Sequence, residues 1–493
     1  MFRSMFEAGM LASILAASCA ATPAEAQSKR KTSSTVSPVR NDRALPARVA
    51  TYMQAAVRND QFTGAILVAR NGVPIVNTAY GMASYELGVP NTPRTVFNIA
   101  SITKQFTAMA IMQLSERGKL NVGDSICDYL SNCPAAWKPI TIRNLLTHSS
   151  GIPNASRLPD WDESLSMRRY RPEEFVDLFR RLPLRFAPGE KSAYSNSGYF
   201  LLGLIIERAS GMPYGEYLKA NIFAPLGMTH SRHNDNRAVI PGAATGYYSR
   251  GTNFITATYV DPSTSLGDGG MVSTTGDLLR WDQALYSEKL VSRASLDAIF
   301  TPYKDGYGYG WEIGTRFGRK TISHSGSDAG FSSFILRVPD ERLTVIILGN
   351  GDRMSAARAA YGLMAIVLGE TYKIPAPQLV DMLWNTISQR GVDAAIAQYR
   401  QLRSANAADY NFGEETLLDL GYALIDAREL DKAEAIFKLN IEMFPKAPYN
   451  YDGLGDVADR RGDRKAAIAH FERSLAMDPT NTYASDALKR LSR

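Results

Sequence analysis

The chain contains few of the residues from which metal centres and disulfide frameworks are built. Among its 493 residues there are three cysteines and five histidines. No zinc-binding spacing involves the cysteines, and Ser231, Arg232 and Asn234 surround His230 and His233, which favours a surface loop over a metal site. The sequence therefore predicts neither a metal nor another cofactor.

A strong excess of one charge is also absent. The formal net charge is +6, and much of it comes from a basic N-terminal cluster: Lys29, Arg30, Lys31, Arg40, Arg43 and Arg48. No motif that interleaves basic and aromatic residues appears, so we expect no nucleic-acid partner. The composition, 45% hydrophobic and 21% charged, is that of a globular protein with two or three domains.

The N-terminal residues have the parts of an export signal. Arg3 supplies a positive start, an apolar run covers residues 10–21, and Ala24-Glu25-Ala26 has the small-x-small pattern of a cleavage site. We predict a signal peptide over residues 1–26, cleaved after Ala26. The mature protein is then periplasmic or secreted.

Two alternatives to simple cleavage remain open. An uncleaved N-terminal anchor is one, although the apolar run is too short to span a bilayer as a stable helix. Lipid attachment at Cys19 is the other, although residues 16–19 match a lipoprotein cleavage box poorly. Removal of the signal leaves only Cys127 and Cys133, which either form a disulfide or remain two separate thiols.

Residues 27–372 divide into a linker and a mixed domain. Residues 27–46 are rich in Ser, Thr, Lys and Arg, have no apolar period, and are predicted to be a disordered linker. Over 47–372, helical signals dominate from about residue 100 to 223, with strand signals on both sides. The predicted strands are 64–69, 73–80, 308–314, 320–324, 332–338 and 343–348. The simplest closure is an α+β fold, in which one antiparallel sheet is flanked by helices with a helical insertion.

Residues 375–493 are predicted to form an all-α tail of repeats. Four features recur at an offset of 34 residues: Leu420-Gly421 as Leu454-Gly455, Ala433 as Ala467, Phe437 as Phe471, and Pro445 as Pro479. This is the tetratricopeptide period, a pair of helices with small residues where they touch. This pattern is consistent with a protein partner that binds the repeats.

Ser101 and Lys104 are the candidate nucleophile and its neighbouring base. They lie three residues apart at the start of a helix predicted over 103–117, so they share a face. The free N–H groups of the first turn create positive potential there. A partly desolvated lysine can accept the hydroxyl proton that a serine must lose. The same spacing at Ser28 and Lys31 shows that it carries little weight alone.

Two further motifs follow in order along the chain. Tyr194 and Asn196 precede an apolar helix predicted over 198–210. A tyrosine near a lysine can accept a proton, and an asparagine amide can hydrogen-bond both a substrate and the lysine. His324 ends a predicted strand, and Gly326 allows a substrate to lie against the strand edge.

Together these motifs resemble the β-lactamase-related serine hydrolases: class C β-lactamases, DD-peptidases, D-aminopeptidases and esterases of one fold. The likeness covers about residues 45–370 and includes the stretches 141–152, 225–228 and 269–274. His148 lies in the first of these stretches and is expected to be structural.

The resemblance implies a role for each motif. Ser101 would form an acyl-enzyme, with Lys104 and Tyr194 as acid and base. Substrate would contact Asn196, His324 and Gly326, and the backbone N–H groups of Ser101 and Ser327 would form the oxyanion hole: these are the expected site residues. Class C β-lactamases usually carry Lys-Thr-Gly where this chain has His-Ser-Gly, which argues against efficient β-lactam hydrolysis.

We expect an exported serine hydrolase that acts on a D-amino acid peptide, a carboxylic ester or a β-lactam. The alternative is a non-catalytic penicillin-recognising binding protein whose repeats recruit a partner.

Overall fold

The computed structural model describes residues 35–36, 42–59, 61–162, 164–235, 237–250, 253–352, 355–405 and 410–492. The predicted signal peptide, residues 1–26, lies outside the described residues, as do 27–34 and 37–41 of the predicted linker. The chain forms two compact units. One contains Thr35–Tyr248 and Thr256–Ile374, and the other consists chiefly of the chain from Pro375 onward.

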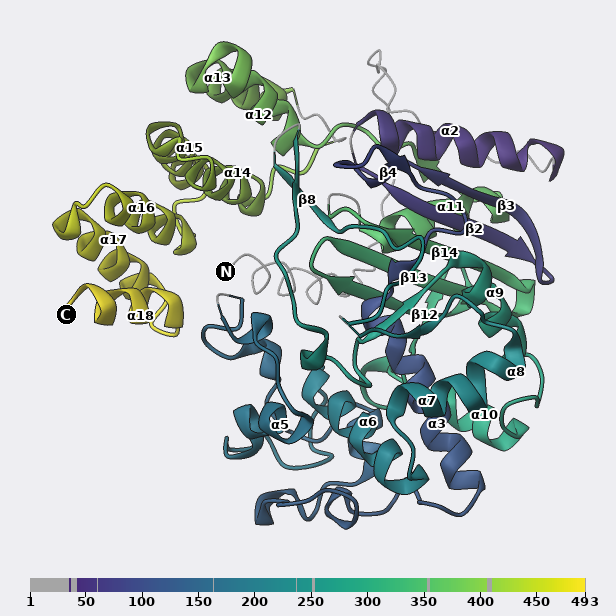
Figure 1. Ribbon diagram of the computed structural model, residues 1–493. Coiled ribbons are helices and arrows are strands. Elements are labelled where there is room, and N and C mark those ends of the chain that lie inside the picture. Colours follow the sequence, from purple (N-terminus) through teal and green to yellow (C-terminus); the bar gives the residue numbers. More distant parts are fainter. Residues whose placement is uncertain are drawn as a thin grey trace, which may run out of the picture. The chain divides into compact units, whose positions relative to one another are not determined.

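A six-stranded antiparallel sheet forms the centre of the first unit (Figure 1). Its order is β11-β12-β13-β14-β2-β3, so strands from both ends of the domain close it as predicted. Ile346 of β14 lies opposite Leu67 of β2 at this junction. The strands are β2 (Gly64–Arg70), β3 (Val73–Tyr80), β11 (Glu312–Arg316), β12 (Arg319–Asp328), β13 (Phe331–Val338) and β14 (Leu343–Gly349).

Two turns next to these strands depend on backbone conformations with positive φ. Asn71 and Gly72 join β2 to β3 with φ of 53° and 75°, which suits a tight hairpin turn. The strand predicted over 308–314 begins only at Glu312. Gly310 has a φ of 75°, and a Cβ there would lie 2.7 Å from the carbonyl oxygen of Lys104, so this segment passes against a helix instead of joining the sheet.

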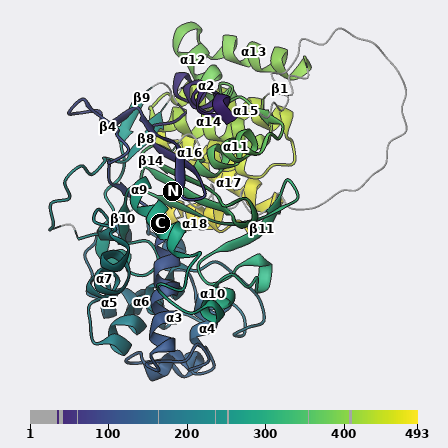
Figure 2. The ribbon, with the colours of Figure 1, turned by 90° about the vertical axis from the view of Figure 1, so that its right-hand side faces the viewer.

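Both faces of the sheet are covered by helices (Figures 1 and 2). Alternate residues of β2 enter two different cores: Ile66 and Val68 pack with α2 (Leu45–Arg58) and α11 (Ala356–Leu368). Ala65 and Leu67 belong to the larger core on the other face. Burial on both faces explains why β2 is apolar throughout instead of alternating with polar residues.

The larger core surrounds α3 (Thr103–Glu116), in which every residue from Thr103 to Leu114 is buried. It packs against α6 (Asn196–Ser210). The other helices of this unit are α4 (Ile142–Leu146), α5 (Pro172–Arg180), α7 (Tyr214–Leu218), α8 (Ala224–Leu226), α9 (Thr275–Ala284) and α10 (Arg293–Ile299). The predicted helices over 103–117 and 198–210 thus correspond to α3 and α6.

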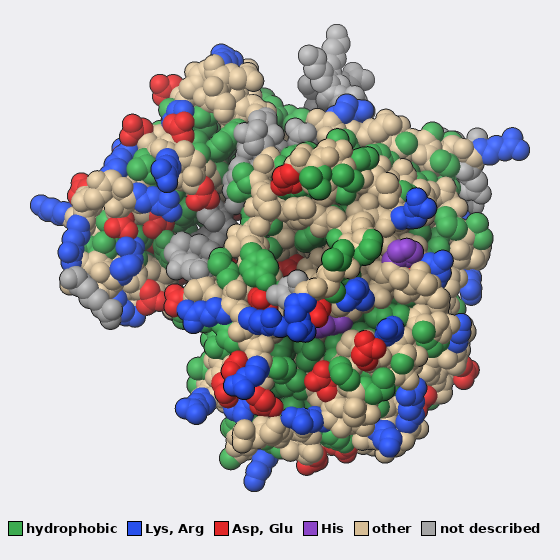
Figure 3. All heavy atoms as spheres, in the orientation of Figure 1, with side chains coloured by type: hydrophobic (Ala, Val, Ile, Leu, Met, Phe, Trp, Pro, Cys, Tyr) green, Lys and Arg blue, Asp and Glu red, His purple; other side chains and the backbone are tan. Residues whose placement is uncertain are grey.

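Short strands form smaller sheets outside the central one. β6, β10 and β7 form a three-stranded sheet, and the pairs β1–β15, β4–β5 and β8–β9 form two-stranded ones. These strands are β1 (Thr35–Val36), β4 (Met82–Ser84), β5 (Val89–Pro90), β6 (Phe97–Asn98), β7 (Arg232–His233), β8 (Tyr247–Arg250), β9 (Asn253–Thr256), β10 (Met271–Ser273) and β15 (Tyr372–Lys373). On the face drawn in Figure 3, basic and acidic side chains are interspersed.

The predicted disordered linker over 27–46 ends earlier than expected. Asp42–Ala44 form a short 3-10 helix, and α2 begins at Leu45, which is buried. Pro46 lies in the first turn of α2, where its missing N–H costs no hydrogen bond, so the proline does not mark the end of a linker there. Thr35–Val36 also pair with Tyr372–Lys373.

In the described residues after Leu379, all regular secondary structure is helical, as predicted for the tail. Gly421 and Gly455 lie 34 residues apart, and a Cβ at these positions would lie 2.5 Å from Phe437 and 2.8 Å from Phe471. The helices are α12 (Leu379–Arg390), α13 (Val392–Ser404), α14 (Glu414–Asp426), α15 (Leu430–Met443), α16 (Tyr449–Arg460), α17 (Arg464–Met477) and α18 (Thr482–Leu491). The recurring glycines therefore make room for the recurring phenylalanine rings.

Cys127 and Cys133 are joined by a disulfide, with their Cα atoms 5.4 Å apart. Both side chains pack against the larger core. The structure thus decides between the two possibilities that the sequence left open.

Replacement of both cysteines by serine should lower the free energy of unfolding by about 2 kcal/mol, because the bridge closes only a short loop in the unfolded chain. Urea unfolding of the wild type and of Cys127→Ser/Cys133→Ser measures this difference. Peptide mapping of the unreduced protein should recover the two cysteine peptides as one linked species. Recovery of two separate thiol peptides would contradict the bridge.

Candidate active site

Ser101 and Lys104 meet at the start of α3. A short 3-10 helix, Ala100–Ile102, leads into α3 and places Ser101 half-buried above the first turn. The Lys104 side chain is fully buried, and its Nζ donates a hydrogen bond of 3.0 Å to Ser101 Oγ. The helical spacing therefore does bring these two side chains together.

Lys104 Nζ hydrogen-bonds acceptors from different segments of the chain. Besides Ser101 Oγ, the side-chain Oδ1 of Asn196 lies at 2.9 Å and the backbone oxygen of Asp268 at 2.7 Å. An ammonium has three N–H donors, so this arrangement suits the charged form. The neutral amine has two donors, which can stay on Asn196 and Asp268 while its lone pair faces Ser101. The geometry thus suits a group that accepts the Ser101 proton.

Tyr194 lies beside the same lysine. Its ring centroid is 4.7 Å from Lys104 Nζ, within the range of a cation–π contact. The ring also packs against the imidazole of His148, at 4.3 Å between centroids, and near His324 at 6.3 Å. The structure therefore brings the second predicted acid–base group to the site.

Asn196 begins α6 with its side-chain amide held at both ends. Its Oδ1 accepts from Lys104, and its Nδ2 donates to Ser156 Oγ at 3.4 Å. Its backbone N–H donates to Asn154 Oδ1 at 3.2 Å, and Ser195 caps the helix. Of the two contacts expected of the Asn196 amide, with the lysine and with substrate, the structure contains the one with Lys104.

His324 differs from the expected substrate-binding role. It is 1% exposed, and its Nδ1 lies 2.6 Å from the carbonyl oxygen of Ser325, so Nδ1 must carry the proton. Nε2 then accepts from the hydroxyl of Tyr307 at 2.8 Å. Burial and the positive charge of Lys104 lower the pKa of His324 to about 3. Both ring nitrogens of this neutral imidazole are engaged within the protein, so it presents no N–H to a substrate.

Gly326 brings β12 against the segment before Ser101. A Cβ at this position would overlap the carbonyl oxygen of Ile99, and Ser333 Oγ donates to the same oxygen at 2.8 Å. Ser327, the next residue, is exposed at this edge of the strand. The close approach of β12 to Ile99 explains why residue 326 is a glycine. It also places Ser101 and Ser327, whose backbone N–H groups are expected to form the oxyanion hole, on adjoining segments.

The backbone just before the nucleophile is strained. Ala100 has a φ of 46°, a left-handed conformation that costs a non-glycine residue about 1–2 kcal/mol. Asn98 Oδ1 accepts the Ala100 N–H at 2.8 Å, and Asn98 Nδ2 donates to Asp328 Oδ2 at 2.8 Å. These contacts from β6 and β12 hold the turn that presents Ser101.

His148 has the structural role that the sequence suggests. It is buried, its Nδ1 accepts the Ser195 N–H at 3.2 Å, and its ring supports Tyr194. Burial and the nearby Lys104 charge lower its pKa well below the usual value. Two residues of the site have no motif in the sequence: Asp268, which contacts Lys104, and Tyr307, which contacts His324. The signal that could have drawn attention to them is the closely spaced glycines around each, at 267–270 and 306–310.

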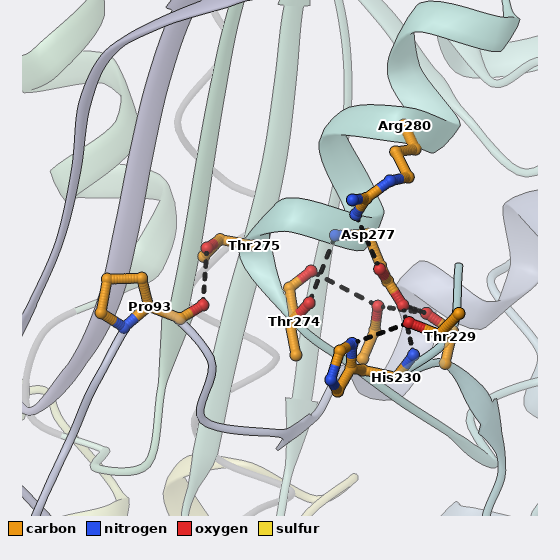
Figure 4. A network of polar contacts seen from close by, with 9 residues as sticks. Pro93, Thr229, His230, Thr274, Thr275, Asp277 and Arg280 are labelled. Carbon is orange, nitrogen blue, oxygen red and sulfur yellow. Dashed lines mark hydrogen bonds and ion pairs between the residues drawn. The ribbon is translucent and has the colours of Figure 1, made fainter. Parts of the chain in front are cut away.

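The stretch 269–274 ends in a polar network (Figure 4). Thr274 Oγ1 caps α9 by accepting the Asp277 N–H at 3.2 Å. The buried Asp277 carboxylate accepts the His230 N–H at 2.8 Å and bonds Arg280 at 3.0 Å. His230 therefore marks a loop anchored to α9. Within the described ranges, no cluster of His, Cys, Asp and Glu could hold a metal, and no helix has the length and apolar character that crossing a bilayer requires.

Comparisons with known proteins point to one family. Residues 48–368 match the family described as Beta-lactamase. Penicillin-binding protein 4* of Bacillus subtilis (strain 168) is 33% identical over 351 residues, which are 66% of this chain and 76% of that protein.

Two solved structures support the same fold. The penicillin binding protein from Bacillus halodurans is 30% identical with a TM-score of 0.58, covering 64% of this chain and 98% of that one. The D-amino acid amidase from Ochrobactrum anthropi SV3 is 23% identical with a TM-score of 0.57, covering 66% and 96%; this likeness concerns the fold alone.

The buried neutral His324 should destabilise the protein in mild acid. Its pKa is lower in the folded protein than in the unfolded chain, so between pH 6.5 and 3 the unfolded chain binds more protons and unfolding becomes easier as pH falls. From pH 7 to 5 this group should remove about 1–2 kcal/mol from the free energy of unfolding.

Urea unfolding at pH 7 and pH 5 measures the effect. His324→Gln should lose that much less stability over the interval than the wild type. His230→Gln, which replaces an exposed histidine, is the control and should behave as the wild type does. An equal loss in the wild type and His324→Gln would show that His324 binds protons alike in the folded and unfolded chains, which would contradict its burial as a neutral imidazole.

Proposed function

The chain belongs to the beta-lactamase family of serine hydrolases, and from this premise we propose that it hydrolyses an ester or amide through an acyl-enzyme on Ser101. The observation that carries the proposal is the position of Lys104, buried and hydrogen-bonded to Ser101 Oγ at 3.0 Å. A serine hydroxyl needs a neighbouring proton acceptor to become a nucleophile, and this lysine is placed to be one.

In the first half-reaction, neutral Lys104 takes the proton of Ser101 while Oγ bonds to the substrate carbonyl carbon. The negative charge that develops on the carbonyl oxygen is stabilised by the N–H groups of Ser101 and Ser327. Collapse of this intermediate breaks the bond to the leaving alcohol or amine. Lys104, with Tyr194 beside it, returns the proton to that leaving group.

In the second half-reaction a water molecule attacks the acyl-enzyme. The same pair accepts a proton from the water, and the carbonyl carbon separates from Ser101 Oγ, which regains its proton. Asn196 keeps Lys104 in place through both steps, because its Oδ1 accepts one lysine N–H at 2.9 Å.

The site favours substrates that need no cation next to the scissile bond. The carboxylate of a β-lactam would gain little from His324, which is neutral and engaged with Tyr307 and Ser325. We therefore propose a carboxylic ester or an amide, including a D-amino acid peptide, as the substrate in preference to a β-lactam.

We further propose that the hydrolase is exported and that its tail binds a protein partner. The Cys127–Cys133 disulfide supports export, because such bridges persist in oxidising compartments. The N-terminal pattern of residues 1–26 supports a periplasmic or secreted location. In the tail, Gly421 and Gly455 lie 34 residues apart, and each faces a phenylalanine ring. This recurrence supports tetratricopeptide-type repeats.

Ser101→Ala should reduce hydrolysis of p-nitrophenyl acetate by several orders of magnitude, as removal of a nucleophile does generally. Ser28→Ala is the matched control, because Ser28 has the same spacing to a lysine, Lys31. Initial rates of the three proteins decide the assignment. Full activity in Ser101→Ala would refute it.

Intact mass after exposure to a penicillin tests the substrate class in the same preparation. We expect little or no rapid turnover of the penicillin by a protein that hydrolyses the ester. Turnover of the penicillin faster than that of the ester would instead identify a β-lactamase. Absence of every Ser101-dependent reaction would favour the non-catalytic binding protein.

A further inference from the structure

The segment 266–271 is fastened along the first turns of α3. Thr107 Oγ1 donates to the carbonyl oxygen of Gly267 at 2.6 Å, and the Met271 N–H donates to Thr103 Oγ1 at 3.2 Å. A Cβ at Gly267 would lie 2.5 Å from the backbone oxygen of Tyr199, so only glycine fits there. The path of the chain on both sides of Asp268 is therefore fixed.

Asp268 contacts the catalytic lysine through its backbone and carries a buried carboxyl group. Its carbonyl oxygen accepts from Lys104 Nζ at 2.7 Å, a shorter distance than those from Nζ to Ser101 Oγ and Asn196 Oδ1. The residue is 6% exposed, and its Oδ1 accepts the Leu266 N–H at 2.9 Å, which folds the side chain back over its own segment. One residue thus presents both a dipole and a carboxyl group near the lysine.

We propose that Asp268 is a positioning residue for Lys104: its carbonyl orients the amine toward Ser101, and its carboxylate favours the ammonium form and so sets the pH at which Lys104 can accept a proton. This inference rests on the proposed function. The attraction is mutual: burial, the largest effect, raises the pKa of the Asp268 carboxyl above its usual value, and the charge of Lys104 opposes that rise.

The other groups that face this pair remain constant when Asp268 alone is changed. His148 and His324 face Lys104 and are neutral, because burial and the lysine charge lower their pKa values. The rings of Tyr194 and Tyr199 lie at 4.7 and 5.6 Å from Nζ.

Two titratable groups also face the carboxyl of Asp268. Asp328 on β12 raises its pKa, and its own carboxylate oxygens accept from Asn98 Nδ2 and from the Ala329 N–H. Tyr214 on α7 bonds Thr107 at 2.7 Å, and burial raises the pKa of that phenol. Both side chains are kept in an Asp268 variant, and loss of the carboxylate removes one of the effects that raise the pKa of Tyr214.

Asp268→Asn tests the proposal, because it keeps an oxygen for the Leu266 N–H and removes the charge. In wild type and variant, kcat/KM for p-nitrophenyl acetate is measured from pH 5 to 10, together with Tm. Without the carboxylate the neutral amine becomes available at lower pH. The midpoint of the acidic limb should therefore move down by about one unit or more, the usual size for a nearby charge.

Asp261→Asn is the matched control. Asp261 is 5% exposed, and its carboxylate accepts the Ser263 N–H at 2.9 Å, so it is a buried aspartate in a comparable turn. Burial raises the pKa of the Asp261 carboxyl, but hydrogen bonds from Ser263 and Tyr259 and the charge of Arg169 outweigh it and lower that pKa. The pH midpoint of this variant should equal that of the wild type, whatever its Tm.

An unchanged midpoint in folded Asp268→Asn, with activity lowered equally at all pH values, would reduce Asp268 to a structural residue and overturn the proposal. Asp268→Ser, which also removes the charge, gives the same decision if the asparagine variant does not fold. The rate of labelling by a fluorophosphonate over the same pH range repeats the measurement without turnover. Activity that survives Ser101→Ala would refute the proposed function itself, whereas a Ser101-dependent rate with an unmoved midpoint would refute only the role of Asp268.

Discussion

The hydrogen bonding of Lys104 Nζ is the interaction on which the rest of the site depends. A buried ammonium without partners would cost several kcal/mol, and a lysine at this position is tolerated only because acceptors from three segments meet it. Ser101 comes from the turn before α3, Asn196 from the start of α6, and the Asp268 carbonyl from a glycine-rich segment. Burial that is costly for the charged form also favours the neutral amine that catalysis requires.

The fold supports this arrangement by closing two glycine-containing segments on the start of α3. Gly310 passes the carbonyl oxygen of Lys104, and Gly326 passes that of Ile99, at distances that leave no room for a Cβ. Gly326 belongs to β12 of the central sheet, and Gly310 lies just before β11, the neighbouring edge strand. The nucleophile and its base are thus held between the sheet and the helical region, and the strained Ala100 is tolerated because its N–H is bonded to Asn98.

Local patterns in the sequence were sufficient to predict much of this molecule. The hairpin at Asn71-Gly72, the closing strand 343–348 and the helix after Ser101 depend on residues close in the chain, and all are present. The motifs that contain Ser101, Lys104, Tyr194 and Asn196 occur along the chain in the order typical of the family, and this order was enough to predict that the four side chains lie together. Contacts between distant segments gave no such signal. The Tyr307 hydroxyl that occupies His324, and the Asp268 carbonyl that holds Lys104, come from loops whose path is set by tertiary packing. For the same reason the segment 308–311 was predicted as a strand, although it packs on α3.

Covalent labelling by a fluorophosphonate at pH 7, located by peptide mapping and timed by intact mass, tests the role of Lys104 directly. We expect one adduct, on Ser101, and a labelling rate at least about 100-fold lower in Lys104→Ala, the usual contribution of a positioned proton acceptor. Lys31→Ala, which removes the lysine of the equally spaced pair at Ser28, should label as the wild type does. An adduct on another residue, or equal labelling rates in the wild type and Lys104→Ala, would contradict the central role of Lys104.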